Sequence, residues 1–227
     1  MTPNRRTTRL ATAAPLVALA SLFALLAFDV SAGGWSASLD SSVAGWVSLN
    51  RHPFLTPLMR SATTLGGMAT MAGATTIACA AFVLRGRSVL ALRFGLLMIT
   101  GATASHIAKT VFERVRPEAA DALTMLPDSF AFPSGHAISS ALFFGGLWVV
   151  LVTWDARPRA GRLAAAVASA CVVLVGLSRV YLGVHRLTDV FAGWVLAAVL
   201  LVAAWRWLAS ADGAVAPSST TGRHGDL

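Results

Sequence analysis

The chain has 227 residues, of which 56% are hydrophobic and only 12% are charged. A typical soluble domain carries about 25% charged residues, so this composition excludes an ordinary soluble globular protein. Eighteen Lys and Arg against ten Asp and Glu give a formal net charge of +8. The cations stand in small groups between apolar blocks and form no continuous basic face of the kind that nucleic acid requires.

Six apolar blocks predict six membrane-spanning helices. A helix needs about 20 apolar residues to cross a bilayer, and its backbone polar groups must find partners within the segment, which favours α-helix. The blocks are residues 10–27, 62–84, 89–107, 137–154, 163–184 and 187–208. The predicted fold class is therefore all-α, a polytopic membrane protein built as one six-transmembrane-helix bundle over residues 10–208.

Groups of arginines in alternate connections predict the orientation of the bundle, because Lys and Arg are enriched in cytoplasmic loops. These groups are Arg5, Arg6 and Arg9, then Arg85 and Arg87, then Arg157, Arg159 and Arg162, and finally Arg206. Both termini are therefore expected to be cytoplasmic. Residues 1–9 would form a cytoplasmic N-terminal tail. Residues 209–227, which lack apolar periodicity, would form a disordered C-terminal tail.

The first block has a second interpretation, because arginines, an apolar run and small residues near Ser31 also resemble a cleavable secretory signal. Cleavage would leave five spans and place a new N-terminus outside. Farther along, one helical face is predicted to carry apolar residues of a short interfacial helix. These residues are Leu39, Val43, Trp46 and Val47, and an ordinary loop helix is the alternative.

Three polar clusters are predicted at the outer ends of the third to sixth spans. They are Lys109 with Arg116 and Pro117, then Pro133 to His136, then Ser178 and Arg179 with His185 and Asp189. A cation near the end of an apolar helix is costly without an anionic partner. Lys109, Arg116 and Arg179 therefore predict an anion site, and the planar guanidinium groups suit phosphate oxygens. Snorkelling of these side chains to lipid headgroups is the alternative.

The second cluster stands immediately before the fourth span. Ser134 is expected to cap this helix, and Gly135 would let the backbone approach a ligand closely. Free N–H groups at a helix N-terminus favour a bound phosphate, with His136 at its mouth. An ordinary helix start with an interfacial histidine is the alternative.

The third cluster contains His185 and Asp189, which are four residues apart and would share one side of a helix. A carboxylate that holds one ring nitrogen supports nucleophilic attack by the other nitrogen. A helix-capping Asp189 beside a surface histidine is the alternative. Histidine and aspartate also bind zinc, but three nearby cations would repel a divalent ion. We therefore expect no metal and no organic cofactor.

The three clusters closely resemble the signatures of the type-2 phosphatidic acid phosphatase superfamily, with every signature position filled. They read KTVFERVRP from Lys109 to Pro117, PSGH from Pro133 to His136, and SRVYLGVHRLTD from Ser178 to Asp189.

The resemblance implies a metal-independent phosphatase with a phosphohistidine intermediate. His185 would attack phosphorus, Asp189 would orient it, and His136 would protonate the leaving group. Lys109, Arg116 and Arg179, with Ser134 and the backbone near Gly135, would hold the phosphate oxygens. Ser178 would bind phosphate or stabilise the turn, and His106, Glu113, Arg114 and Arg186 are treated as scaffold.

The predicted function is hydrolysis of a phosphomonoester or diphosphate of a membrane lipid. Family members with this plan imply phosphatidic acid, phosphatidylglycerol phosphate or undecaprenyl diphosphate as substrates. A lipid phosphotransferase using the same site and a non-catalytic protein that binds anionic lipid are alternatives. A vanadate-dependent haloperoxidase would normally be soluble.

The expected partners are a lipid phosphate and the bilayer, with neither nucleic acid nor an obligate protein partner. The one Lys beside 17 Arg is typical of GC-rich bacterial genomes. We therefore predict a multi-pass protein of the plasma membrane, with its active site on the extracytoplasmic side.

Overall fold

A computed structural model describes residues 5–118, 121–154 and 158–210, and within these ranges all regular secondary structure is helical. The helices are α1 (Arg5–Ala32), α2 (Ser36–Leu49), α3 (Leu55–Leu65), α4 (Met68–Leu84), α5 (Ser88–Phe112), α6 (Gly135–Trp154), α7 (Pro158–Tyr181) and α8 (Leu187–Ala209). The predicted C-terminal tail lies, beyond residue 210, outside the described residues. Of the predicted N-terminal tail, residues 5–9 belong to α1.

Five of the described helices are long and apolar enough to cross a membrane, namely α1, α5, α6, α7 and α8. The pair α3 and α4 passes the same criterion when taken together, which gives a sixth candidate span. The prediction of an all-helical polytopic membrane protein is confirmed. The expected boundaries were close, although the fifth span ends at Tyr181 rather than at residue 184.

The prediction of one continuous helix over residues 62–84 is wrong. α3 and α4 are bent by 50° at Gly66 and Gly67, and Gly67 has extended backbone angles of φ −65° and ψ 151°. Glycine stabilises a helix poorly because it has the most backbone freedom to lose. The hydroxyl of Ser139 on α6 donates a hydrogen bond of 3.1 Å to the Gly66 carbonyl at the break.

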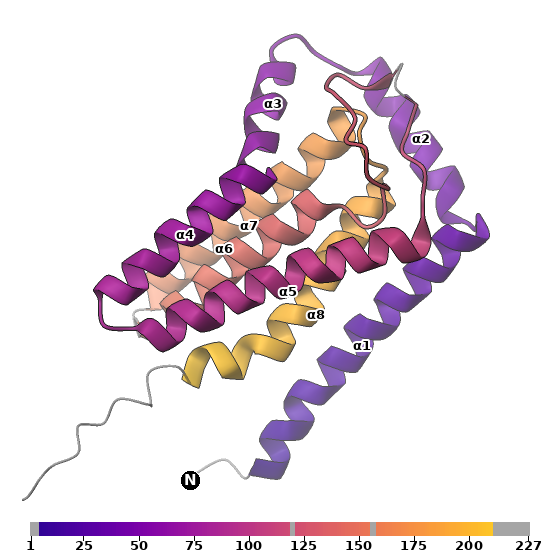
Figure 1. Cartoon of the computed structure of the whole chain (residues 1–227). Coiled ribbons are helices and arrows are strands. Elements are labelled where there is room, and N and C mark those ends of the chain that lie inside the picture. The colour runs from indigo at the N-terminus through magenta and orange to yellow at the C-terminus, as the bar shows by residue number, and fades with distance from the viewer. Residues whose placement is uncertain (1–4, 119–120, 155–157, 211–227) are drawn as a thin grey trace, which may run out of the picture.

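The core of the bundle is formed by α6, which packs against α7 and α8, with α5 and α4 on its other side. Figure 1 shows α4 to α8 as one slanted group and α1 running along α8. A close approach of α6 and α8 depends on Gly193, where an added Cβ would lie 2.9 Å from the Ala137 Cβ and 2.9 Å from the Ser134 carbonyl oxygen. α8 is thereby held against the first turn of α6.

The segment before the second span forms the helix α2, as expected, but its four predicted apolar residues divide between two environments. Val43 and Val47 pack against a buried cluster that includes Val180. Leu39 and Trp46 are 41% and 67% exposed. The side of α2 that faces the bundle also buries Asp40, at 3% exposure.

The polar clusters lie at one end of the bundle, because α5 ends, α6 begins, α7 ends and α8 begins there. In Figure 1 this end is at the upper right, where α2 and the segment between α5 and α6 lie. The α4–α5 connection and the end of α8 lie at the other end. Residues far apart in the chain are therefore neighbours at this polar end.

Candidate active site

The first polar cluster begins where α5 stops. Glu113 has a left-handed backbone, with φ of 45°, and ends the helix. Lys109 in the last turn donates a hydrogen bond of 2.5 Å to the Phe130 carbonyl. Arg116 donates from Nε to the Ser129 carbonyl at 2.7 Å and from Nη1 to the Val184 carbonyl at 2.9 Å. Both cations therefore contact the chain just before the second cluster.

The second cluster is anchored by Phe132, which is fully buried and packs against the rings of Phe23 on α1 and Phe112 on α5. The Ser134 backbone N–H donates to the Asp189 carbonyl at 2.9 Å, which joins this segment to α8. α6 then starts at Gly135.

The expected side-chain cap by Ser134 is absent. Its hydroxyl is completely buried and has no hydrogen-bond partner within the described part of the chain. The backbone carbonyl of Ser134 instead accepts the Ile138 N–H at 3.1 Å and starts the helix. A buried polar atom without a partner is rare in folded proteins and requires an explanation.

His136 lies in the first turn of α6 and is half-buried. A Cβ added to Gly66 would clash with Val175 Cγ1 on α7, and would lie 3.3 Å and 3.4 Å from His136 Cδ2 and Cβ. The break between α3 and α4 therefore packs closely against both α7 and His136. Among the described residues, no hydrogen bond is made by the ring of His136.

The third cluster is shaped by the end of α7. Arg179 is 4% exposed, and its Nη1 donates to the Thr63 hydroxyl of α3 at 2.5 Å. Its Nε is buried and has no hydrogen-bond partner in the described ranges. Ser178 is not directed to a ligand, because its hydroxyl donates to the Val175 carbonyl of its own helix at 2.6 Å.

A tight turn after α7 places His185 back over that helix. Gly183 has a φ of +72°, and an added Cβ there would clash with the Asp121 carbonyl oxygen. The backbone N–H groups of Val184 and His185 both donate to the Arg179 carbonyl, at 3.2 and 3.3 Å. Because glycine alone adopts this conformation easily, Gly183 fixes the path of the chain at the site.

His185 and Asp189 form a buried pair, with 4% and 0% exposure. His185 lies in the turn before α8 rather than on the helix, and its Nδ1 is 3.4 Å from Asp189 Oδ2. The same oxygen accepts the Arg186 N–H at 2.9 Å. Asp189 therefore both caps α8 and contacts the imidazole, and the alternative of a surface histidine is wrong.

The other ring nitrogen of His185 points to the cations, since Nε2 is 3.2 Å from Arg116 Nη1. Arginine only donates, so this contact assigns the lone pair to Nε2 and the proton to Nδ1. Burial lowers the pKa of His185 to about 4, with Arg116 and Arg179 lowering it further and Asp189 opposing them. The imidazole is therefore neutral at pH 7.

Sequence reasoning missed a second set of contacts to Asp189. Arg114, treated as scaffold, donates from Nη1 to Asp189 Oδ1 at 2.5 Å and from Nη2 to Asp40 Oδ2 at 2.7 Å. Although burial opposes it, the two carboxylates raise the pKa of Arg114. The sequence held one indication of this contact. Asp40 is the one charged residue in the segment Ser36–Leu49, and a charge that becomes buried requires a partner of opposite charge.

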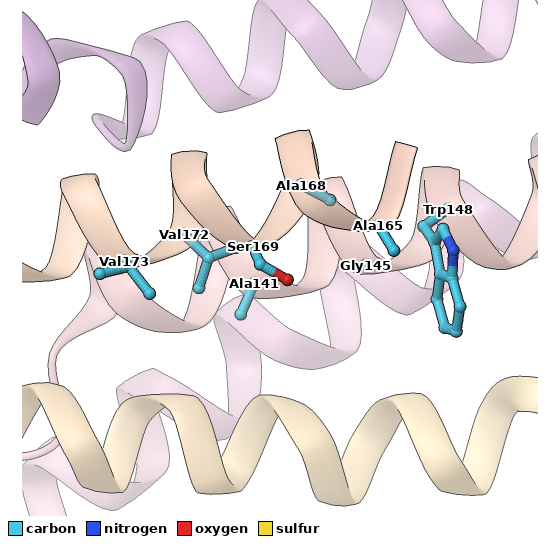
Figure 2. Close-up of a pocket in the computed structure, with 8 residues that line it drawn as sticks. All are labelled: Ala141, Gly145, Trp148, Ala165, Ala168, Ser169, Val172 and Val173. Carbon is cyan, nitrogen blue, oxygen red and sulfur yellow. The ribbon is translucent and has the colours of Figure 1, made fainter. Parts of the chain in front are cut away.

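Two cavities lie near these helices. One of about 540 Å³ lies between α2 and the segment that follows α5, and its wall includes His185, Asp40 and Arg114. The other, of about 320 Å³, lies between α6 and α7 and is shown in Figure 2. Its lining is Ala141, Gly145, Trp148, Ala165, Ala168, Ser169, Val172 and Val173, which includes no ionisable side chain.

Together these contacts bring all three clusters to one place. Arg116 and Asp189 touch His185, Arg179 is close enough to affect it electrostatically, and the Ser134 backbone is bonded to Asp189. In the described residues, no three His, Cys, Asp or Glu side chains are grouped to hold a metal ion. The arrangement suits a phosphate group, with several cations around one neutral imidazole.

The fold and this site define a phosphatase family. The family model described as the PAP2 superfamily matches residues 90–212, more than half of the chain. The chain therefore belongs to the PAP2 superfamily, a family of metal-independent phosphatases, and the resemblance predicted from three motifs is confirmed.

Two comparisons narrow this class to its membrane branch. Phosphatidylglycerophosphatase B of Bacillus subtilis (strain 168) is 31% identical over 164 residues, which cover 72% of this chain and 80% of that protein. The crystal structure of a transmembrane PAP2 type phosphatidylglycerolphosphate phosphatase from Bacillus subtilis aligns with a TM-score of 0.76 and 30% identity. The alignment covers 85% of this chain and 96% of that one. This protein is a membrane lipid phosphate phosphatase.

Proposed function

We propose that this enzyme removes the terminal phosphate of phosphatidylglycerophosphate on the extracytoplasmic side of the plasma membrane. The substrate is supported by the names of both relatives. The orientation is supported by the alternate arginine groups, since Lys and Arg are enriched in cytoplasmic connections. The polar site then opens at the outer surface.

His185 is the nucleophile, and the observation that carries this assignment is the state of its ring. Asp189 holds Nδ1, while Nε2 keeps its lone pair and lies beside Arg116. The distance of 3.4 Å to Asp189 is long for a hydrogen bond, but such contacts commonly tighten when substrate binds. The carboxylate then stabilises the positive charge that develops on the imidazole during attack.

The reaction takes two steps that balance. In the first, Nε2 of His185 bonds to phosphorus, the bond from phosphorus to the lipid oxygen breaks, and protonated His136 gives its proton to that oxygen. In the second, neutral His136 takes a proton from water, the water oxygen attacks phosphorus, and the bond to His185 breaks. Inorganic phosphate leaves and both histidines return to their first state.

The cations stabilise charge on the phosphate oxygens. Lys109 and Arg116 now donate to backbone carbonyls of residues 129 and 130, and a phosphate offers them stronger, charged acceptors. Arg179 Nε and the Ser134 hydroxyl have no partner in the described residues. We propose that these donors bind the oxygens over which negative charge spreads in the transition state.

Apolar side chains next to the cations support a lipid substrate. Val111, Val115 and Phe130 are 65%, 75% and 38% exposed. Val111 and Val115 lie within two residues of Lys109 and Arg116 in the sequence, and the Phe130 carbonyl accepts the hydrogen bond from Lys109. Acyl chains lying against such residues would keep their contact with hydrocarbon while the phosphate enters the polar end of the bundle.

Phosphate release from a panel of lipids tests this proposal. Purified protein in detergent is assayed with phosphatidylglycerophosphate, phosphatidic acid and undecaprenyl diphosphate, each with and without EDTA. We expect the highest kcat/KM for phosphatidylglycerophosphate and no loss with EDTA. A higher kcat/KM for either of the other lipids would overturn the substrate, and loss with EDTA that a divalent ion restores would overturn the mechanism.

A further inference from the structure

The orientation of Asp189 depends on more than its contact with His185. Its Oδ2 accepts hydrogen bonds from His185 Nδ1 and the Arg186 N–H, and its Oδ1 accepts from Arg114 Nη1 at 2.5 Å. The residue is fully buried. Its direction and charge are therefore set by these three donors.

Arg114 is in turn held from two sides. Its Nη2 donates to Asp40 Oδ2 at 2.7 Å, and its Nη1 donates to the Thr188 hydroxyl at 2.7 Å. Asp40 also accepts the Thr188 N–H at 3.0 Å and the Thr188 hydroxyl at 2.6 Å. The hydroxyl thus accepts from Arg114 and donates to Asp40, which closes the set of bonds.

The set spans three parts of the fold. Asp40 is on α2, Arg114 follows α5, and Thr188 and Asp189 begin α8. Asp40 and Arg114 both line the cavity beside His185, and their ion pair of 2.7 Å joins α2 to the segment after α5. Figure 1 shows α2 beside the segment that leaves α5. Asp40 lies before residues 90–212, which the family model matches.

The charges of this set complement the reaction. Two carboxylates and one guanidinium leave one negative charge, which faces a single imidazole. That imidazole is neutral at rest and cationic when bonded to phosphorus. The two carboxylates, the guanidinium and the cationic imidazole of the phosphoenzyme therefore sum to zero charge. This neutralisation stabilises most strongly in a buried site, because the dielectric constant there is low.

We propose that Asp40 and Arg114 are positioning residues of the phosphatase reaction: Asp40 fixes the guanidinium, and the guanidinium keeps Asp189 ionised and aligned with His185. This inference rests on the proposed role of His185 as nucleophile. The planar fork of arginine contacts both carboxylates at once, whereas the compact ammonium of lysine provides one point of charge.

The competing explanation is that Asp40 and Arg114 only attach α2 to the rest of the bundle. The chain offers a matched control for this explanation. Asp29 on α1 also binds α2, because its Oδ2 accepts the Ser36 N–H at 3.2 Å. Asp29 has no contact with Asp189 among the described residues. Asp29→Asn therefore weakens the attachment of α2 without touching the set around Asp189.

The test compares Arg114→Lys, Asp40→Asn, Asp189→Asn and Asp29→Asn in purified full-length protein. Vanadate, which resembles phosphorus under attack, counts the competent sites by its binding stoichiometry, and kcat is expressed per site. We expect kcat per site to fall about 10- to 100-fold in Arg114→Lys and Asp40→Asn. KM should stay unchanged, because the proposed phosphate-binding cations are intact, whereas vanadate affinity should fall together with kcat, because vanadate resembles the phosphorus that His185 attacks. Asp29→Asn should match the wild type.

Two outcomes would overturn the inference. One is wild-type kcat per site in Arg114→Lys and Asp40→Asn while Asp189→Asn is inactive, which would leave the proposed function standing. The other is an equal loss in Asp29→Asn, which would identify a tether. High activity in Asp189→Asn would instead contradict the proposed mechanism itself. If a single variant does not fold, the double variant Asp40→Asn with Arg114→Gln removes both charges, and its kcat per site should remain low.

Discussion

Two groups of polar side chains near His185 differ in how their hydrogen bonds are satisfied. In the first, the positioning side, Arg114 donates to Asp189, Asp40 and the Thr188 hydroxyl, and that hydroxyl donates to Asp40. In the second, the binding side, the Ser134 hydroxyl and Arg179 Nε are buried without partners in the part of the chain that the structure describes. The donors of the first group are therefore satisfied within the protein, whereas those of the second can still bind an acceptor.

This difference separates positioning from binding. A satisfied network rigidifies the groups within it, which suits the residues that aim the imidazole. An unsatisfied buried donor costs about 1 to 3 kcal/mol, and a phosphate that accepts its hydrogen bond recovers that cost. Variants on the two sides should therefore change different kinetic parameters.

The largest effect is expected at His185, the proposed nucleophile. His185→Ala removes its imidazole, so phosphate release should fall by at least about 10,000-fold. His52→Ala is the control, because His52 is an exposed histidine near the same end that binds Tyr181 through its backbone. Turnover of His185→Ala near that of the control would contradict the assignment.

A smaller loss is expected on the binding side at Arg179. Arg179→Gln removes a charge that we propose binds the phosphate oxygens, and kcat/KM should fall about 100- to 1,000-fold. Vanadate inhibition should weaken in parallel. Thr63→Val, which removes only the hydroxyl that Arg179 contacts, should lose much less activity. Unchanged vanadate inhibition in Arg179→Gln would show that this cation does not bind phosphate.

Ser134 tests the same side with a single hydroxyl. Ser134→Ala should lower kcat/KM about tenfold, while Tm stays the same or rises because a buried donor without a partner has been removed. Ser178→Ala is the matched control, since that hydroxyl is bonded within its own helix. A lower Tm with full activity in Ser134→Ala would reverse the interpretation.

The smallest effect concerns pH. Burial lowers the pKa of His185 to about 4, and only the unprotonated ring attacks phosphorus. The activity that depends on His185 should therefore be complete above about pH 5 and decline as the pH falls through 4, rather than through the ordinary value of about 6.5. The measurement is kcat/KM against pH, corrected for ionisation of the substrate phosphate. A decline that begins near 6.5 after correction would be incompatible with a buried neutral imidazole.

Most of the helices could be predicted from the sequence, because hydrocarbon leaves a long apolar segment few alternatives to the α-helix. The break at Gly66 and Gly67 could not, since two glycines in an apolar block are equally compatible with close helix packing. The close contacts at Gly66 are made by Val175 and His136, which lie 109 and 70 residues farther along the chain.

The amino-acid sequence by itself determined the helical membrane fold, the family, and the identities of the residues grouped in the three motifs. Only the tertiary structure decided that Arg114 joins Asp189 to Asp40, that Thr63 supports Arg179, and that the Ser134 hydroxyl has no partner among the described residues. The physical reason is the separation of the partners along the chain. Apolar periodicity and motif spacing are properties of one segment, whereas a buried charge is stabilised by whichever side chain the packing of distant helices brings to it.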